Sequence, residues 1–169
     1  VPALFQPFFN KVSINTLYVE FKENQKIDRN ELISNLVENG YDPADLVTKP
    51  SSYALRGSVV DIFPSNSKYP VRIDLDDDLI SSISIFDTDT QKTLRKINSF
   101  IVRPSRGFVL NINSIKIFKK NWRSRFKDDG EVFESVSEGK FISGIEFYSS
   151  LFYDEKPSLK DYLYDFNIF

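Results

Sequence analysis

Two arginines, Arg56 and Arg72, are the side chains best suited to chemistry in this 169-residue chain. Arg56 stands where we expect the first of three short strands to begin, and Arg72 lies on the polar face of the second. A guanidinium group is a planar fork of N–H donors, so an arginine on a rigid strand is suited to bind a carboxylate of a partner protein. The alternative is that both arginines pair with carboxylates of their own sheet, at Asp74, Asp76 or Asp78.

An acidic run follows Arg72, with aspartates at positions 74, 76, 77 and 78. Carboxylate oxygens are the ligands that Ca²⁺ and Mg²⁺ prefer, so the run could bind a divalent cation. However, side chains alternate along a strand, which sends Asp74 and Asp76 to one face and Asp77 to the other. The run also lacks the spacing and the glycine of an EF-hand loop. We therefore expect these carboxylates to be hydrated or ion-paired at the surface.

A basic cluster lies in the segment NSIKIFKKNWRSRFK, residues 113–127. Its basic residues are Lys116, Lys119, Lys120, Arg123, Arg125 and Lys127. They could contact a phosphate backbone, but the solvent face of an amphipathic helix is the simpler interpretation and the one we favour. Trp122 falls on the apolar side of this helix and is predicted to be part of a core.

The composition argues against several kinds of catalysis. The chain has no histidine and no cysteine, so it lacks the commonest general base, the commonest zinc ligand and any thiolate nucleophile. The phosphate-binding patterns GxxxxGK[ST] and GxGxxG are absent. A net charge of −2 gives no argument for a nucleic-acid or membrane partner, and no apolar run approaches the roughly 20 residues of a membrane span. Together these features favour a binding module.

The elements that must position the arginines are short β-strands. Residues 59–63 are mostly β-formers and stop at Pro64, residues 71–76 alternate strictly, and residues 83–85 alternate again. These runs predict a small antiparallel sheet with one apolar face. Residues 17–21 predict a further strand, and the alternation continues over 97–102 until Pro104, where we place a domain boundary.

The clearest predicted helix covers residues 28–39. Asp28 suits the N-cap, Glu31 completes a capping box, and Gly40 follows as a residue with positive φ. Its apolar face is expected to hold Leu32, Ile33, Leu36 and Val37.

Two more helices are predicted after the boundary. The first covers residues 113–127, is capped by Asn113 or Ser114, and has an apolar stripe made of Ile115, Phe118, Trp122 and Phe126. The second is short, around residues 132–136, and is stopped by Gly139. The aromatic segment that begins at Gly144 is predicted to be loop.

The predicted sheet resembles a known family in its sequence. ALRGSVVDIFP, followed by PVRIDLDDDLISSISIFDTDTQKTL, is similar to the UvrB-homology region of the bacterial transcription-repair coupling factors (Mfd), and to their relative UvrB. The flanking segments ELISNLVENGYDPADLV and FKKNWRSRF also resemble the coupling factors. EGKFISGIEFYSSLFYDE contains a G-I-E-[YF] stretch that UvrB lacks at this place, so the resemblance favours a coupling factor.

The resemblance implies an α+β fold, in which a small antiparallel β-rich domain is inserted in an α/β module with flanking helices. Residues 1–20 would be the tail of domain 1a, residues 21–104 domain 2, and residues 105–169 the start of domain 1b. The chain would be a fragment of a cytoplasmic protein. It would bind no cofactor itself, because the ATP and magnesium of the family are bound outside this region.

The resemblance also implies partners. Proteins of this family displace stalled RNA polymerase by ATP-dependent translocation on double-stranded DNA, and domain 2 recruits UvrA for nucleotide excision repair. The full-length protein would also make intramolecular contacts with its C-terminal domain, and no membrane is involved. The motor lies C-terminal to this region, so we expect this chain to be non-catalytic.

Family positions that contact UvrA match this chain at Arg56 and Arg72. A third position departs, because Asp76 stands where the family has an aromatic residue, and Leu79 replaces an acidic one nearby. An aromatic anchor often carries much of an interface's energy, whereas a carboxylate adds a charge to desolvate. The substitution predicts weakened or lost UvrA binding. Two alternatives stay open: part of a UvrB-type damage-recognition helicase, or a degenerate domain that folds but no longer binds UvrA.

Overall fold

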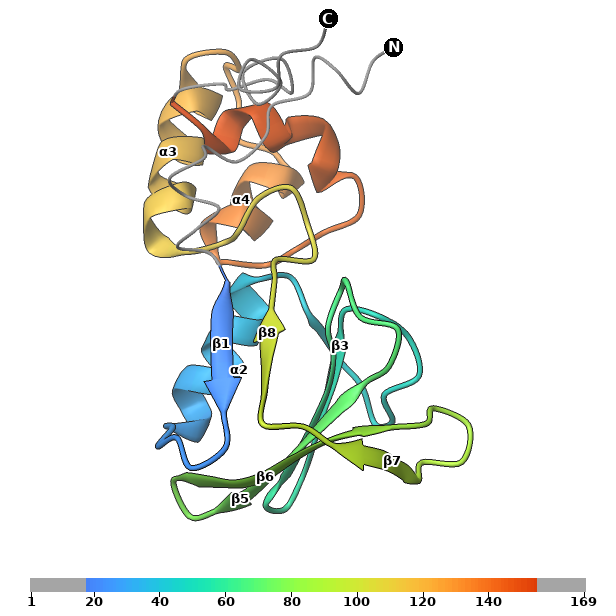
Figure 1. Ribbon diagram of the computed structural model, residues 1–169. Coiled ribbons are helices and arrows are strands. Elements are labelled where there is room, and N and C mark those ends of the chain that lie inside the picture. The colour runs from blue at the N-terminus through green and yellow to red at the C-terminus, as the bar shows by residue number, and fades with distance from the viewer. Residues whose placement is uncertain (1–17, 155–169) are drawn as a thin grey trace, which may run out of the picture. The chain divides into compact units, whose positions relative to one another are not determined.

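The computed structural model describes residues 18–154 (Figure 1). The chain divides into two units between Ser105 and Arg106, beside the boundary predicted at Pro104. The described part of each unit has its own hydrophobic core. We call them the first unit (described residues 18–105) and the second unit (described residues 106–154). The predicted α+β class is confirmed, whereas the assignment to domains 1a, 2 and 1b stays a prediction, and most of the proposed domain 1a tail lies outside the described residues.

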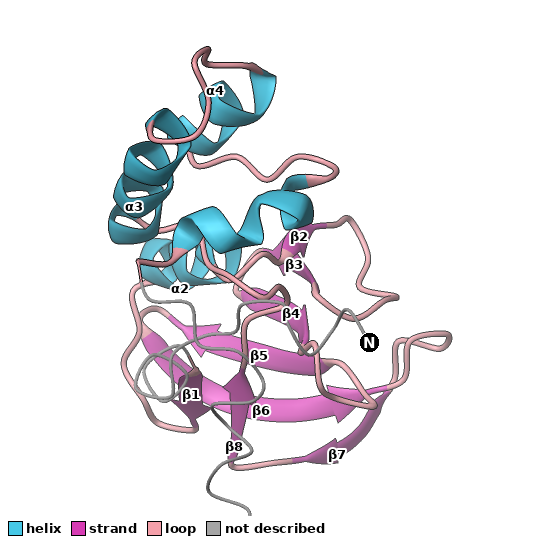
Figure 2. Cartoon of the chain, turned by 90° about the horizontal axis from the view of Figure 1, so that it is seen from above, coloured by secondary structure: helices cyan, strands magenta, loops and turns pink. Residues whose placement is uncertain are grey.

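The first unit contains a six-stranded sheet in the order β2-β3-β4-β5-β6-β7 (Figure 2). Its strands are β2 (Asp42–Pro43), β3 (Ser52–Arg56), β4 (Val59–Phe63), β5 (Val71–Asp76), β6 (Leu79–Phe86) and β7 (Thr93–Lys96). Neighbouring strands are antiparallel except β2 and β3. The three predicted strands are confirmed as β4, β5 and β6, but the sheet is larger than predicted because β2 and β3 extend it beyond β4 and β7 extends it beyond β6.

The position predicted for Arg56 is wrong. Arg56 ends β3 instead of standing before the first strand, and it lies opposite Val59 across a hairpin. Gly57 makes the turn of this hairpin with a φ of 59°, a conformation that favours glycine because it has no Cβ.

A separate two-stranded sheet joins the two ends of the first unit. Strand β1 (Val19–Lys22) pairs antiparallel with β8 (Ser99–Val102) (Figure 1). The predicted strand at 17–21 is confirmed from Val19 onward, and residue 17 lies outside the described residues. The alternation predicted over 97–102 forms a strand only from Ser99, and that strand pairs with β1, away from the six-stranded sheet.

Helix α2 (Arg29–Glu38) begins at the predicted cap. The Asp28 Oδ1 accepts hydrogen bonds from the backbone N–H groups of Asn30 at 2.7 Å and Glu31 at 2.9 Å. Both donors would otherwise lack partners in the first turn. Among the hydrogen bonds of the described residues there is no return bond from the Glu31 side chain, so Asp28 caps the helix without a full capping box.

The end of α2 is fixed by a Schellman motif around Gly40. Gly40 has a φ of 78°, its N–H donates to the Val37 carbonyl, and the Tyr41 N–H donates to the Leu36 carbonyl. Leu36 is buried as predicted, but Val37 is 39% exposed and does not belong to the apolar face.

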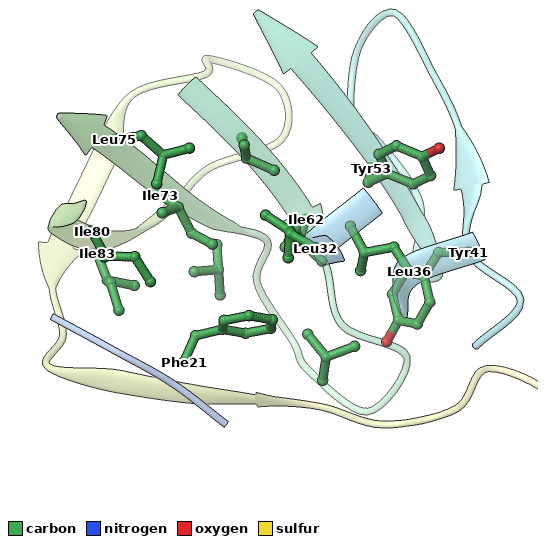
Figure 3. Close-up of a cluster of buried hydrophobic side chains, with 13 residues drawn as sticks. Phe21, Leu32, Leu36, Tyr41, Tyr53, Ile62, Ile73, Leu75, Ile80 and Ile83 are labelled. Atoms are coloured by element: carbon green, nitrogen blue, oxygen red, sulfur yellow. The ribbon is translucent and has the colours of Figure 1, made fainter. Parts of the chain in front are cut away.

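The core of the first unit lies on one face of the six-stranded sheet (Figure 3). Ile62, Ile73 and Ile83 of the central strands pack with Leu32 of α2 and Phe21 of β1. Side chains alternate along each strand, so the residues between these core positions must project from the opposite face. The charged residues of β4 and β5 are therefore brought together there.

The second unit contains α3 (Ile112–Arg123), α4 (Glu131–Ser137) and a 3₁₀ helix, η2 (Ile145–Phe152). The predicted short third helix is confirmed as α4. Helix α3 is shorter than the predicted 113–127, and its cap is Asn111, which forms a capping box with Ser114. The loop predicted after Gly144 is wrong over Ile145–Phe152, because Ile145, Tyr148 and Leu151 recur every three residues, which suits a 3₁₀ helix. From residue 155 onward this prediction lies outside the described residues.

Tyr41 connects the end of α2 to the chain that follows β8. Its hydroxyl donates to the Arg103 carbonyl at 2.9 Å and accepts from the Ser65 N–H at 3.0 Å. The side chain is 2% exposed, and its burial raises the pKa of Tyr41 above the ordinary value of 10.0. The folded protein therefore favours the neutral phenol.

We expect the free energy of unfolding to fall as the pH rises above about 10, because the unfolded chain ionises Tyr41 first. A Tyr41→Phe variant should lose about 1–3 kcal/mol at pH 8, since the Arg103 carbonyl and the Ser65 N–H lose their partner. Between pH 8 and pH 10.5, its free energy of unfolding should also fall by less than that of the unmodified chain. Urea unfolding at pH 8 and pH 10.5 measures both, and equal alkaline losses in the two proteins would contradict the assignment to Tyr41.

Candidate functional site

The face of the sheet opposite the core carries charged side chains from three strands. Asp61 of β4 lies opposite Arg72 of β5, and Val59 lies opposite both Arg56 of β3 and Asp74 of β5. We call this surface the charged face and define it by Arg56, Asp61, Arg72, Asp74 and Asp76. The structure thus brings together Arg56 and Arg72, the two arginines singled out in the sequence, and places Asp76 at the far end of β5 on the same side.

Asp61 is the centre of the charged face and was missed by the sequence analysis. Its side chain is fully buried, at 0% exposure. Arg72 binds it with two parallel hydrogen bonds, from Nε to Oδ1 at 2.7 Å and from Nη2 to Oδ2 at 2.9 Å. Arg56 donates from Nη2 to the same Oδ2. The alternative that the arginines pair within their sheet is confirmed, but the predicted carboxylates were the wrong ones.

Arg72 is held by hydrogen bonds and by an aromatic ring. Its Nη1 donates to the Gln91 carbonyl at 3.4 Å, and its guanidinium lies 4.4 Å from the ring centroid of Phe86. Phe86 is fully buried in a small apolar cluster on this face. Hydrogen bonding to Asp61 is the main cause that raises the pKa of Arg72 above its ordinary value. Arg72 therefore stays charged and oriented.

Arg56 is the more accessible of the two arginines. Its side chain is 44% exposed, against 19% for Arg72. Its Nη2 is bound to Asp61, and the Arg56 side chain makes no other hydrogen bond among residues 18–154. The half-exposed Arg56 side chain therefore has N–H donors left without a partner among the described residues.

The acidic run is spread over the β5–β6 hairpin. Asp74 accepts from the Ser82 hydroxyl at 2.6 Å, and Asp78 lies 3.5 Å from the Lys26 ammonium group. Asp76 is exposed and lies opposite Leu79. Within the described part of the chain, no three histidine, cysteine or acidic residues cluster in a way that could hold a metal ion.

The basic cluster of the second unit lies on the solvent side of α3. Lys120 pairs with Asp154 at 2.9 Å, and Arg123 lies 3.8 Å from Asp129. Trp122 is 5% exposed, so its predicted place in the core is confirmed. Arg125 and Lys127 follow the end of the helix. None of these contacts tests the phosphate-binding alternative.

Arginines held on one face of a sheet can bind the carboxylates of a partner protein and add to the specificity of such an interface. Residues 19–108, more than half of the chain, match the family model described as the UvrB interaction domain, and the chain belongs to this family. Within residues 18–154, no helix is long and apolar enough to cross a membrane.

Relatives of known name support the resemblance seen in the sequence. The transcription-repair-coupling factor of Escherichia coli K12 is 34% identical over 145 residues, which cover 83% of this chain and 13% of that protein. The same factor of Haemophilus influenzae is 35% identical over 159 residues, 92% of this chain and 14% of that protein. UvrABC system protein B of Mycoplasma mycoides is 30% identical over 171 residues, 89% of this chain and 25% of that protein. The chain thus spans a quarter or less of each relative.

Proposed function

We propose that this chain is the UvrA-docking region of a transcription-repair coupling factor and that the charged face is the docking surface. The observation that carries the proposal is that the matched residues 19–108 include every member of the charged face. Arg56, at the end of β3, is 44% exposed there and has N–H donors without a partner among residues 18–154. A carboxylate of UvrA could bind these donors without ordering a flexible side chain first, which favours affinity.

The role of the whole protein is part of the same proposal. In it, UvrA recruitment through this region accompanies the displacement of stalled RNA polymerase by ATP-driven movement along double-stranded DNA. ATP and magnesium would be bound outside this chain, which would act without catalysis in the cytoplasm. Contacts with the C-terminal domain of the same protein would compete for or protect the surface.

A second candidate is a UvrB-type damage-recognition helicase. The match to UvrABC system protein B of Mycoplasma mycoides, at 30% identity over 89% of this chain, favours it. The coding sequence on either side separates the two: a phosphate-binding loop upstream would favour the UvrB type, and a polymerase-binding domain downstream the coupling factor.

Asp76 provides the test of docking. We expect Asp76→Phe to bind UvrA from the same organism about tenfold more tightly than the unmodified chain, because an aromatic side chain adds apolar burial and removes a charge. Asp76→Asn is the matched control, since it removes the charge without adding a ring, and its affinity should be intermediate. Calorimetric titration of each protein with UvrA measures the effect.

The outcomes separate the alternatives. If the unmodified chain binds UvrA as tightly as Asp76→Phe does, the role given to Asp76 is contradicted. Binding by Asp76→Phe alone would support the degenerate domain. Failure of both proteins to bind UvrA, while both remain folded by circular dichroism, would overturn the docking proposal.

A further inference from the structure

We infer that Asp61 is a positioning residue of the charged face: it holds the Arg56 guanidinium in the orientation that binds a partner carboxylate. Asp61 cannot touch a partner itself, because its side chain is fully buried. The identity of the partner rests on the proposed function, whereas the positioning of Arg56 by Asp61 can be tested without one.

Arg72 fixes the carboxylate. Two parallel hydrogen bonds, at 2.7 and 2.9 Å, join the Arg72 Nε and Nη2 to the two oxygens of Asp61. The ring of Phe86 lies against the Arg72 guanidinium at 4.4 Å, and the Gln91 carbonyl accepts from its Nη1. A carboxylate held in this way has one orientation, so its Oδ2 offers Arg56 a fixed acceptor.

Arg56 depends on that acceptor. It is the last residue of β3, and its Nη2 bond to Asp61 is the one side-chain hydrogen bond that it makes among residues 18–154. The turn that follows is also held, because Arg29 of α2 donates to the Gly57 carbonyl at 2.5 Å. The backbone beneath Arg56 is therefore fixed, and Asp61 restricts the side chain that would otherwise rotate freely.

Asp61 also balances charge. Arg56 and Arg72 share Oδ2, so their guanidinium groups lie close together and would repel each other without the carboxylate between them. With Asp61 present, the three side chains of Arg56, Asp61 and Arg72 together carry a formal charge of +1 instead of the +2 of the two arginines alone. Asparagine at position 61 would keep the shape and one acceptor oxygen. It would lose the negative charge that holds the guanidinium groups of Arg56 and Arg72.

A partner-free measurement tests the positioning directly. Nuclear magnetic resonance of ¹⁵N-labelled arginine side chains in the 169-residue chain reports the mobility of each Nε–H bond. We expect the Arg56 side chain to be ordered in the unmodified chain and mobile in Asp61→Asn. An Arg56 side chain that is mobile in the unmodified chain, or equally ordered in Asp61→Asn, would overturn the inference.

A double-mutant cycle tests the consequence for binding. With UvrA from the same organism as probe, Asp61→Asn and Arg56→Ala are each expected to weaken binding about 10- to 100-fold. In the Arg56→Ala background, Asp61→Asn should cause a much smaller further loss, because Asp61 acts through Arg56. Equal fold losses in both backgrounds would show that Asp61 acts independently and would contradict the inference.

Arg56→Lys covers the case in which Asp61→Asn does not fold. This variant keeps the charge at an exposed position but cannot form the planar fork, so we expect it to fold normally and to bind UvrA about tenfold more weakly. Binding as tight as that of the unmodified chain would show that the orientation of the fork does not matter. If the unmodified chain does not bind UvrA, the proposed function fails, while the resonance experiment still decides the role of Asp61.

Discussion

Asp61→Ala is expected to lower the free energy of unfolding of the first unit by about 3–5 kcal/mol, because it removes the buried partner of two cations. Arg72 would keep its place over Phe86 at 4.4 Å but lose both hydrogen bonds to Asp61. Its side chain is 19% exposed, so water cannot fully replace the lost carboxylate. The repulsion between Arg56 and Arg72 would add to the loss.

Amide hydrogen exchange measures this loss where it occurs. The N–H groups of β4 and β5 should exchange faster in Asp61→Ala, because these central strands open only when the sheet unfolds. Asp76→Ala is the matched control, since Asp76 is an exposed aspartate on the same face. We expect it to change the stability by no more than about 0.5 kcal/mol. Equal effects of the two substitutions would mean that the Asp61 contacts do not stabilise the sheet.

The central strands could be predicted because their pattern is local. The alternation over 71–76 places Ile73 in the core and Arg72 on the other face, as the structure shows. Strand β3 was missed because Arg56-Gly57 was interpreted as the start of a strand instead of its end. A glycine with positive φ marks the turn between two strands, so Tyr53 and Ala54 upstream of it should have indicated the first arm of a hairpin.

The partner of the arginines could not be found from spacing along the chain. The carboxylates nearest Arg72 in sequence, Asp74 and Asp76, lie on its own strand, where consecutive residues of one face are about 7 Å apart. Asp61 is 11 residues away but lies directly opposite Arg72 across the sheet. One local signal was available: Asp61 interrupts an otherwise apolar strand, and a charge inside a buried strand requires a partner.

In the second unit, too, local sequence patterns predicted the core residues better than the helix ends. The apolar stripe placed Phe118 and Trp122 correctly in a core. The cap was predicted two or three residues late, because the exposed Ile112 gave no signal that the helix had begun. The helix η2 was missed because a period of three is rarely sustained over eight residues.

Phe118→Ala is expected to cost the second unit about 3–5 kcal/mol, because it leaves a cavity at the centre of an aromatic cluster. Phe118 has no exposed surface, and its ring centroid lies 4.7 Å from that of Phe152, 5.4 Å from Trp122 and 6.3 Å from Phe133. Three aromatic contacts would be lost together with the buried area.

Phe147→Ala is the matched control for this substitution, since it removes the same side chain in the same unit from a position that is 90% exposed. Its effect should stay within about 0.5 kcal/mol. Trp122 is the one tryptophan of the chain and contacts Phe118, so its fluorescence during urea unfolding reports on this core specifically. We expect the urea concentration at the unfolding midpoint to be lower in Phe118→Ala and unchanged in Phe147→Ala. Equal midpoints would show that the cluster around Phe118 does not hold the second unit together.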